Sequence, residues 1–517
     1  MGYSMADDQE KKGNGGYGHA LFGRRVIYTD ESEINAGNIL SVLQNAYPAH
    51  VTNRMEIEYL YNYYKGKQPI LERVKEVRPE ICNKVVVNYA NEIVSFKVGY
   101  LASEPIQYVA LDNKNDEVKT LNDYMYQVGK QAQDQEVIEW SHICGTAYRY
   151  VQANNPANVG EGDAPFDLFT LDPRTTFVIY SSTFKKTRLA GVTYTISETT
   201  GTIINFVVYT KEKIYTFGVE NLLEEEKRSV TAFVESKNPL GEIPIFEYPA
   251  NNARLGAFEI VLPLLDAYSN ISSNDVDGIE QTIQSFLKFI NCDLDGDGLA
   301  NLRAYGAIKL KSVDGAPADV DSVKTDYSYD GANITKEDIR RNILTICGMP
   351  VQGNGTSISA NNGAILIQNG WSQAEARAKS SETMFKGSER LMLNLVLKIC
   401  KTVGKDKIEL KTSDIDYKFT RRNYENVQVK AQVLCEMLNT PRVHPKLAFE
   451  SCGLFSDPEN AYLISEEYYA KTLKEWTVED VLDLDKAVNG NGNETTEAVR
   501  TDGYSDSTTV NTVKEGD

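Results

Sequence analysis

The pattern of apolar and polar positions between Ile334 and Pro350 predicts an amphipathic helix. Its apolar residues recur at the spacing of one helix face. Thr335 stands where a side chain can cap the first turn, with an acid three residues later. Gly348 and Pro350 are typical of a helix end. The segment 351–363 that follows has three glycines, three asparagines and no charged residue, so we expect a polar loop there.

A second, much longer helix is predicted from Ala364 to about Cys400. At 1.5 Å of rise per residue it would be roughly 55 Å long, which exceeds what a small domain needs. Gly370 lies near its start. Because glycine in a helix interior costs about 1 kcal/mol relative to alanine, we expect a bend at Gly370 that an alanine would stiffen. A long helix that follows an uncharged loop indicates an elongated architecture in which the loop is exposed to a binding partner.

The rest of the pattern predicts an α+β chain. Helical periodicity begins near Glu33 and predicts helices at 53–64, 85–101, 116–128 and 131–144. After a short strand at 106–110, runs of β-branched and aromatic residues predict strands at 147–151, 168–171, 176–180, 191–197, 203–210 and 213–217. Further strands are expected at 408–411 and 415–420, and short helices at 426–438, 445–452 and 458–473.

Two helical stretches flank a small insert. The first begins at Leu255, carries apolar residues as far as Ile290, and has a weak point at Gly278. Residues 292–333 read as turns and strands, and the second stretch is the helix after Ile334. Residues 1–30 are predicted to be a flexible tail, and 481–517 a disordered acidic tail, because both have few aliphatic residues.

Composition and charge restrict the possible functions. The chain of 517 residues allows three to four domain-sized units. Its net charge of −19 argues against a protein that binds nucleic-acid phosphates over a broad surface. Thirty tyrosines suit interfaces, because tyrosine has an apolar ring and a polar tip. The seven scattered cysteines, without a CxxC motif, are expected to be mostly buried reduced thiols of a protein made in the cytosol. We expect neither a signal peptide nor a membrane partner.

Motifs for catalysis or cofactor binding are not apparent. Acids at 293, 295 and 297 resemble the start of a calcium loop, but its closing acid is replaced by Ala304, so a simple turn is favoured. The Gly-Lys pairs at 129–130 and 404–405 lack the following Ser or Thr of a phosphate-binding loop. His142 is expected to be a packed core residue, and His444 a helix-start residue. The expectation is a protein that is not an enzyme and has no cofactor or metal.

The chain carries an ordered series of characteristic segments. They are Tyr63–Ile70, Asn83–Tyr89, Ile93–Val94, Lys97, Gly99–Leu101, Pro105, Gly241–Ile245, Asn251–Asn252, Pro263–Tyr268, Ile343–Pro350 and Phe419–Asn423. This series resembles the portal proteins of tailed bacteriophages, in particular the siphophage type from Gram-positive hosts. The resemblance runs from about residue 50 to 470. No segment is unique to the family, and the specificity lies in their order.

The resemblance implies a ring of about twelve copies at one capsid vertex, with double-stranded DNA passing through its central channel. Each copy would have a wing, a stem of two helices, a β-containing clip and a helical crown. The implied parts are a wing at 31–256 and 364–423, stem helices at 257–291 and 334–349, a clip at 292–333, a tunnel loop at 350–363 and a crown at 424–480.

The resemblance also implies that the tunnel loop projects into the DNA channel. The tunnel loop would present only uncharged polar side chains: Gln352, Asn354, Thr356, Ser357, Ser359, Asn361 and Asn362. Their exchangeable hydrogen bonds would let DNA slide, because no phosphate is neutralised. Lys336, Arg340 and Arg341 are candidates for a mild basic ring in the stem. Ordinary salt bridges between subunits are the favoured alternative for these three.

The implied partners are other components of the virion. Terminase, and later a head-completion or adaptor protein, would bind the clip, and major capsid and scaffolding proteins would touch the wing. The protein would occupy the portal vertex of the virion, and the host cytoplasm during assembly. Two other functions stay open. A different head–tail connector ring would usually be shorter and lack the wing, and a nucleic-acid-processing enzyme with an undetected site would show metal-dependent turnover.

Overall fold

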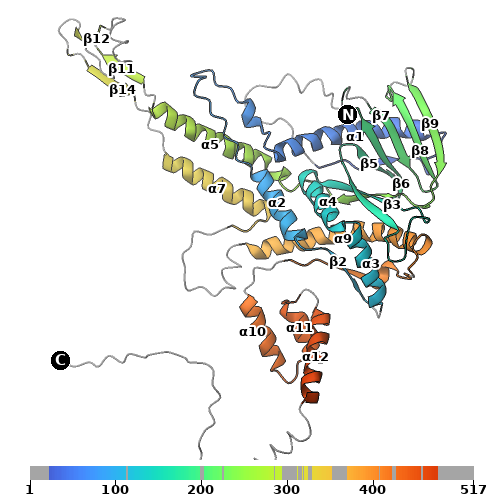
Figure 1. Ribbon diagram of the computed structural model, residues 1–517. Helices are drawn as coiled ribbons and strands as arrows, with labels where there is room; N and C mark the ends of the chain where they lie inside the picture. The colour runs from blue at the N-terminus through green and yellow to red at the C-terminus, as the bar shows by residue number, and fades with distance from the viewer. Residues whose placement is uncertain are drawn as a thin grey trace, which may run out of the picture. The chain divides into compact units, whose positions relative to one another are not determined.

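The chain divides into two compact units, residues 1–423 and 424–517, built of helices and mainly antiparallel sheets (Figure 1). This mixture is compatible with the predicted α+β class. The computed structural model describes residues 23–111, 114–197, 199, 203–223, 226, 228–283, 286–290, 292–293, 311–312, 317, 319–323, 329–351, 370–406, 408–421, 427–455 and 458–475.

A six-stranded sheet covered by helix α1 (Ile39–Tyr64) forms one part of the first unit. Its strands lie in the order β1 (Ile27–Thr29), β5 (Thr176–Ser181), β6 (Arg188–Ile196), β7 (Ile203–Tyr209), β8 (Lys213–Glu220) and β9 (Ser229–Lys237). Neighbours are antiparallel except β1, which is parallel to β5. Alternate residues of a strand point to one face, so Phe177, Phe206 and Phe217 share one core with Ile39 and Leu43 of α1.

A second core surrounds the long helix α9 (Trp371–Thr402). It contains the three-stranded sheet β10 (Ile245–Pro249), β3 (Thr146–Ala153) and β4 (Phe166–Leu171). It also contains helices α3 (Asn115–Gln127) and α4 (Lys130–Cys144), and the antiparallel pair β2 (Gln107–Ala110) and β15 (Ile415–Lys418). Strand β15 pairs with β2 across some three hundred residues of sequence, which ties the segment after α9 to the N-terminal half.

A pair of helices, α5 (Leu262–Ile283) and α7 (Tyr329–Cys347), extends from a third core (Figure 1). That core joins their base to α1, α4 and α2 (Tyr89–Ala102). Beyond the far end of α5, strand β11 (Phe286–Ile290) pairs with β14 (Asp319–Val323), and β12 (Cys292–Asp293) pairs with β13 (Lys311–Ser312). Short 3-10 helices lie at η1 (Pro69–Glu72), η3 (Glu259–Val261) and η4 (Thr412–Asp414).

The second unit contains three described helices around a small core. They are α10 (Val427–Leu438), α11 (Pro445–Cys452) and α12 (Pro458–Glu475). Their core is formed by Leu434, Ala448, Phe449 and Cys452. His444 is the N-cap of α11 and its side chain accepts a hydrogen bond from the backbone N–H of Lys446, so its predicted helix-start role is confirmed.

The structure corrects the predicted ends of the helix pair. The first helix ends at Ile283 rather than 291, because Phe286–Ile290 pair as a strand with 319–323. A short apolar run has no periodicity that separates helix from strand, so the distant pairing partner decides. The second helix begins at Tyr329, which makes Thr335 an interior residue rather than a cap. Its hydroxyl donates to the carbonyl of Gly331 at 2.9 Å.

Other predictions also need correction. Gly370 is the N-cap of α9, with φ of +77°, so it precedes the described helix and is not a bend inside it. Residues 408–411 are not a strand. The predicted flexible tail at 1–30 extends too far, since Ile27–Thr29 form β1. Strands β9 and β10 were not predicted, because turn residues and the exposed side chains on both faces of β9 obscure alternation.

Candidate functional site

The candidate basic ring lies on α7, and two of its three members have acidic partners in their own chain. Lys336 Nζ lies 2.5 Å from Asp275 Oδ2 on α5. Arg340 Nη1 lies 3.0 Å from Glu337 Oε1, one turn earlier on α7. Arg341 is exposed on the outer side of the helix. The pairing of Lys336 holds α5 and α7 together, and it reduces the positive charge that the pair presents to a polyanion.

The candidate tunnel loop lies outside the described residues, with Gln352, Asn354, Thr356, Ser357, Ser359, Asn361 and Asn362, but both of its attachment points are described. A Cβ atom built on Gly370 would lie 3.7 Å from the carbonyl oxygen of Met349 and 3.7 Å from the Cα of Pro350. The chain therefore leaves the end of α7 and returns to the same point at the start of α9. The two described ends of the intervening segment, Val351 and Gly370, therefore lie close together.

Glycines make this meeting of chain ends possible. Gly348, with φ of +67°, ends α7: its N–H donates to Thr345, and the N–H of Met349 donates to Leu344 at 2.8 Å. The side chain of Arg377 lies across Gly348, where a Cβ atom would come within 2.2 Å of Arg377 Cδ. Gly370 takes a left-handed conformation at the start of α9, and its carbonyl accepts from Ala374 at 3.1 Å.

The middle of α9 is fixed by a buried network around Glu389. Its carboxylate accepts hydrogen bonds from the hydroxyls of Tyr108 and Tyr248, both at 2.7 Å, and forms ion pairs with Lys130 and Arg149. Burial alone raises the pKa of a carboxyl group. The two cations and two hydroxyls outweigh burial here and lower the pKa of Glu389 from 4.5 to about 2. Glu389 is therefore ionised, and it joins α9 to β2, β3, β10 and α4.

A segment between α1 and α2, here called the strap (residues 71–85), is bound to the side of α5. Its centre is Asp277, which is buried and forms ion pairs with Arg73 at 3.1 Å and Lys75 at 2.6 Å. Asp277 also accepts hydrogen bonds from the backbone and side-chain amides of Asn83, at 2.7 and 2.9 Å. One turn away, the Ser273 hydroxyl accepts from the N–H of Val85. The strap and α5 thus form one rigid part.

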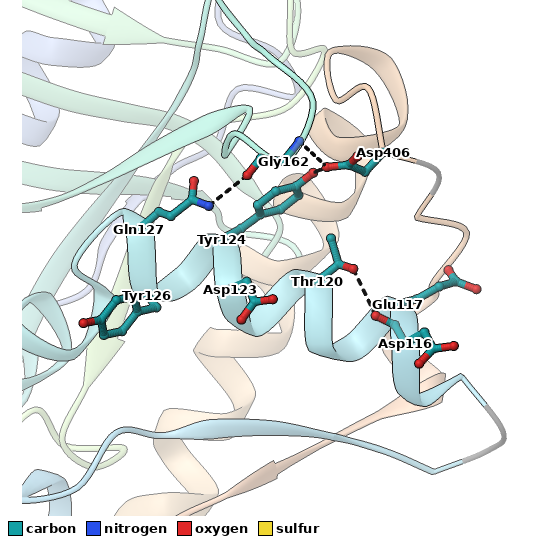
Figure 2. Close-up of a pocket in the computed structure, with 9 residues that line it drawn as sticks. All are labelled: Asp116, Glu117, Thr120, Asp123, Tyr124, Tyr126, Gln127, Gly162 and Asp406. Atoms are coloured by element: carbon teal, nitrogen blue, oxygen red, sulfur yellow. Dashed lines mark hydrogen bonds between the residues drawn. The ribbon is translucent and has the colours of Figure 1, made fainter.

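A hollow of about 710 Å³ opens beside α3 (Figure 2). Its lining includes the acids Asp116, Glu117, Asp123 and Asp406. The Tyr124 hydroxyl and the N–H of Gly162 both donate to Asp406, which links three segments (Figure 2). Four acids would repel phosphate, so this hollow is unsuited to nucleic acid.

The described residues contain neither a candidate metal-binding cluster nor a candidate membrane-spanning helix. Within the described ranges, His, Cys, Asp and Glu side chains do not gather in threes where they could hold a metal ion. The candidate calcium loop at 293–298 lies almost wholly outside those ranges. None of the helices described is both long and apolar enough to cross a membrane. Cys144, Cys347, Cys400 and Cys452 are buried free thiols, as predicted, while Cys435 is exposed.

Sequence reasoning missed the two clusters that position the helices, at Glu389 and at Asp277. Glu389 lies among the buried apolar residues of α9. A charged residue on the apolar face of a predicted helix could have indicated a buried ion-pair cluster. His142 was predicted correctly as a core residue: it is buried, and burial followed by the nearby charge of Lys97 lowers its pKa to about 4.

A helix pair carries two small strand pairs beyond its far end, and the ends of α7 and α9 meet at its base on an α+β body. This arrangement is typical of a structural subunit that makes contacts at several places. The chain belongs to the SPP1 Gp6-like phage portal protein family, whose model matches residues 44–480. It is therefore a portal protein, a structural channel protein of the phage capsid vertex that acts in genome packaging. Portal-family membership implies an oligomeric ring with DNA, terminase and capsid partners in general. No curated protein matches the chain.

Proposed function

We propose that about twelve copies of this chain form a ring in which the uncharged segment 351–363 after α7 faces the DNA, in a siphophage of a Gram-positive host. The observation that carries the proposal is the meeting of Met349, Pro350 and Gly370. A loop held at both ends by α7 and α9 can project without loosening the helices that carry it. The parts proposed are a wing at 31–256 and 364–423, a stem of α5 and α7, a clip between them and a crown at 424–480.

The chemistry of the loop suits passage of DNA rather than capture. Its sequence from 351 to 363 has amides, hydroxyls and glycines but no cation, so it would neutralise no phosphate. Lys336 and Arg340 are paired with acids of their own chain, which supports a stem with little free positive charge. Of the three candidates for a mild basic ring, only Arg341 has no ion-pair partner among the described residues. Weak, exchangeable contacts would allow the duplex to slide in both directions.

The proposed external partners follow the same division. The clip, including β11 and β14, would bind terminase during packaging and a head-completion protein afterwards. The wing, with its six-stranded sheet, would contact major capsid and scaffolding proteins. ATP hydrolysis would belong to terminase, in agreement with the missing phosphate-binding loop motif.

Deleting Gly353–Ser359 tests the role of the loop. We expect the ring to assemble as in the wild type, as seen by negative-stain imaging and native mass, because neither attachment point is removed. Packaging or retention of DNA in particles should fall. A control in which the same seven positions are replaced by glycine and serine separates loop length from loop chemistry. Normal packaging by the deletion variant would show that the loop has no such role.

A further inference from the structure

The strap presents large apolar side chains to solvent. Val74 is 83% exposed and Val77 is 79% exposed, and Leu71 beside them is also exposed. The acids Glu72, Glu76 and Glu80 surround them and are exposed as well. Two large apolar side chains exposed on one short segment forgo the stabilisation that burial would give, and a partner that covers them would gain it.

The exposure is not the result of a loosely attached segment. The strap is bound along one side of α5, through Ser273, Asn274, Asp277 and Glu280. Arg73 and Lys75, the neighbours of Val74, both turn inward to Asp277. Because these inward side chains are fixed, Val74 between them is held outward. The strap thus carries a preformed apolar surface, here called the strap tip, which consists of Val74 and Val77.

The outer side of α7 offers a matching surface. Ile334 is 65% exposed, and Asp338, Arg341 and Thr345 follow it at helical spacing on the same exposed side. Neither Arg341 nor Glu76 of the strap has an ion-pair partner among the described residues. An apolar residue beside a cation is the complement of an apolar tip beside an acid.

These two surfaces lie on opposite sides of α5. Ser273 and Asp277, which bind the strap, are four residues apart and share one side of α5. Asp275, which pairs with Lys336 of α7, is two residues from Asp277 and so points about 200° away. Figure 1 shows the segment before α2 and helix α7 on either side of α5. Asp275 binds Lys336, close to Ile334, and Asp277 binds the residues on either side of Val74. Because the two acids are two residues apart on α5, Ile334 and the strap tip lie at similar heights along the helix pair.

We propose that the strap tip of one copy packs on the outer side of α7 of the next copy in the ring. Val74 and Val77 cover Ile334, and Glu76 pairs with Arg341. Two different surfaces on opposite sides of one subunit make a head-to-tail contact, which is the type that closes into a ring. The inference rests on the proposed ring and names the surfaces that hold it together.

The first test places a charge in the apolar tip. In Val74→Asp we expect the ring fraction, measured by native mass near the assembly midpoint, to fall about tenfold or more. Phe184→Asp is the matched control, because Phe184 is 90% exposed on the turn between β5 and β6, outside the strap. Both variants should fold like the wild type, since neither side chain is buried. Equal ring fractions for Val74→Asp and the wild type would overturn the inference.

The second test detects the contact directly. Val77→Cys and Ile334→Cys are made in separate chains that also carry Cys292→Ser and Cys435→Ser. The chains are mixed before assembly and then oxidised. A disulfide-linked dimer should form in the mixture, because neighbouring copies bring the cysteines introduced at positions 77 and 334 together. Either variant alone should give no such dimer, because it carries only one of the two introduced cysteines.

Charge reversal provides a third measurement. Glu76→Arg and Arg341→Glu should each reduce the ring fraction, and the double variant should recover it. If the wild type forms rings while no cross-link and no recovery are seen, the strap inference fails and the proposed function stands. If the wild type forms no ring under any assembly condition, the proposed function itself fails.

Discussion

Arg149 Nη1 lies 3.2 Å from Glu389 Oε2, and neither side chain has any exposed surface. Arg149 also pairs with Asp134 at 2.6 Å, and Lys130 bridges Asp134 and Glu389. Two acids and two bases from α4, β3 and α9 thus form one neutral buried cluster, completed by two tyrosine hydroxyls. The cluster fixes the middle of α9 to the sheet, so the loop at its N-terminal end is carried on a rigid helix.

Replacing Glu389 with glutamine should destabilise the first unit strongly. Removing one partner of a buried ion pair leaves the remaining charges uncompensated and costs about 3–5 kcal/mol. Urea unfolding followed by far-UV circular dichroism measures the loss. The matched control is Asp416→Asn. Asp416 lies on β15 and forms a surface ion pair with Lys386, which is on α9 like Glu389. A similar, small shift in both variants would show that the cluster adds little to stability.

Stability should fall when the pH drops below about 6.5, before carboxylates titrate. Burial lowers the pKa of His50 to about 3 and that of His142 to about 4. Both stay neutral in the folded chain, while the unfolded chain takes up protons below about 6.5 and is favoured there. Glu389, with its pKa lowered to about 2, adds a further loss between about pH 4.5 and 2. Unfolding free energies measured from pH 7 to 5 should give a flatter slope in His142→Gln; an unchanged slope would contradict the assignment.

Replacing Gly370 with alanine should destabilise the start of α9 rather than stiffen it. With φ of +77°, an L-residue there costs about 1 kcal/mol or more, although a Cβ atom itself meets only ordinary contacts. Gly370→Asn should cost less, because asparagine tolerates this conformation. The control is Gly387→Ala in the interior of α9, which has open space and should gain about 1 kcal/mol. Thermal unfolding of the three variants measures the order of their stabilities. A higher melting temperature for Gly370→Ala than for the wild type would refute the prediction.

Reversing the charge of Lys336 should weaken the contact between α5 and α7. Lys336→Glu faces Asp275 with a like charge, so we expect the melting temperature to fall, and the double variant with Asp275→Lys to recover most of it. If Lys336 instead served mainly to contact DNA, the double variant would recover stability but not DNA retention in particles. Both readouts from the same three proteins therefore separate a stem-holding role from a channel role.

Local patterns predicted much of the secondary structure. Helix α11 has the predicted bounds, α4 and α10 differ by one residue at one end, and α3 differs by one residue at each end. Helical spacing and strand alternation are properties of neighbouring residues, so they can be recognised without a fold. The run 286–290 was misassigned because its four apolar residues carry no distinct period, and only its pairing with 319–323 makes it a strand.

The sequence by itself determined the α+β class, the uncharged loop between two helices and, through the order of its segments, the resemblance to portal proteins. Only the tertiary structure decided which charges are neutralised. Lys336 looks like a free cation in the sequence, and Asp275, some sixty residues earlier, cancels it. The same holds for Glu389 and Asp277. Ion pairs and strand pairs join residues that are distant in sequence, and no local period records which partners the fold brings together.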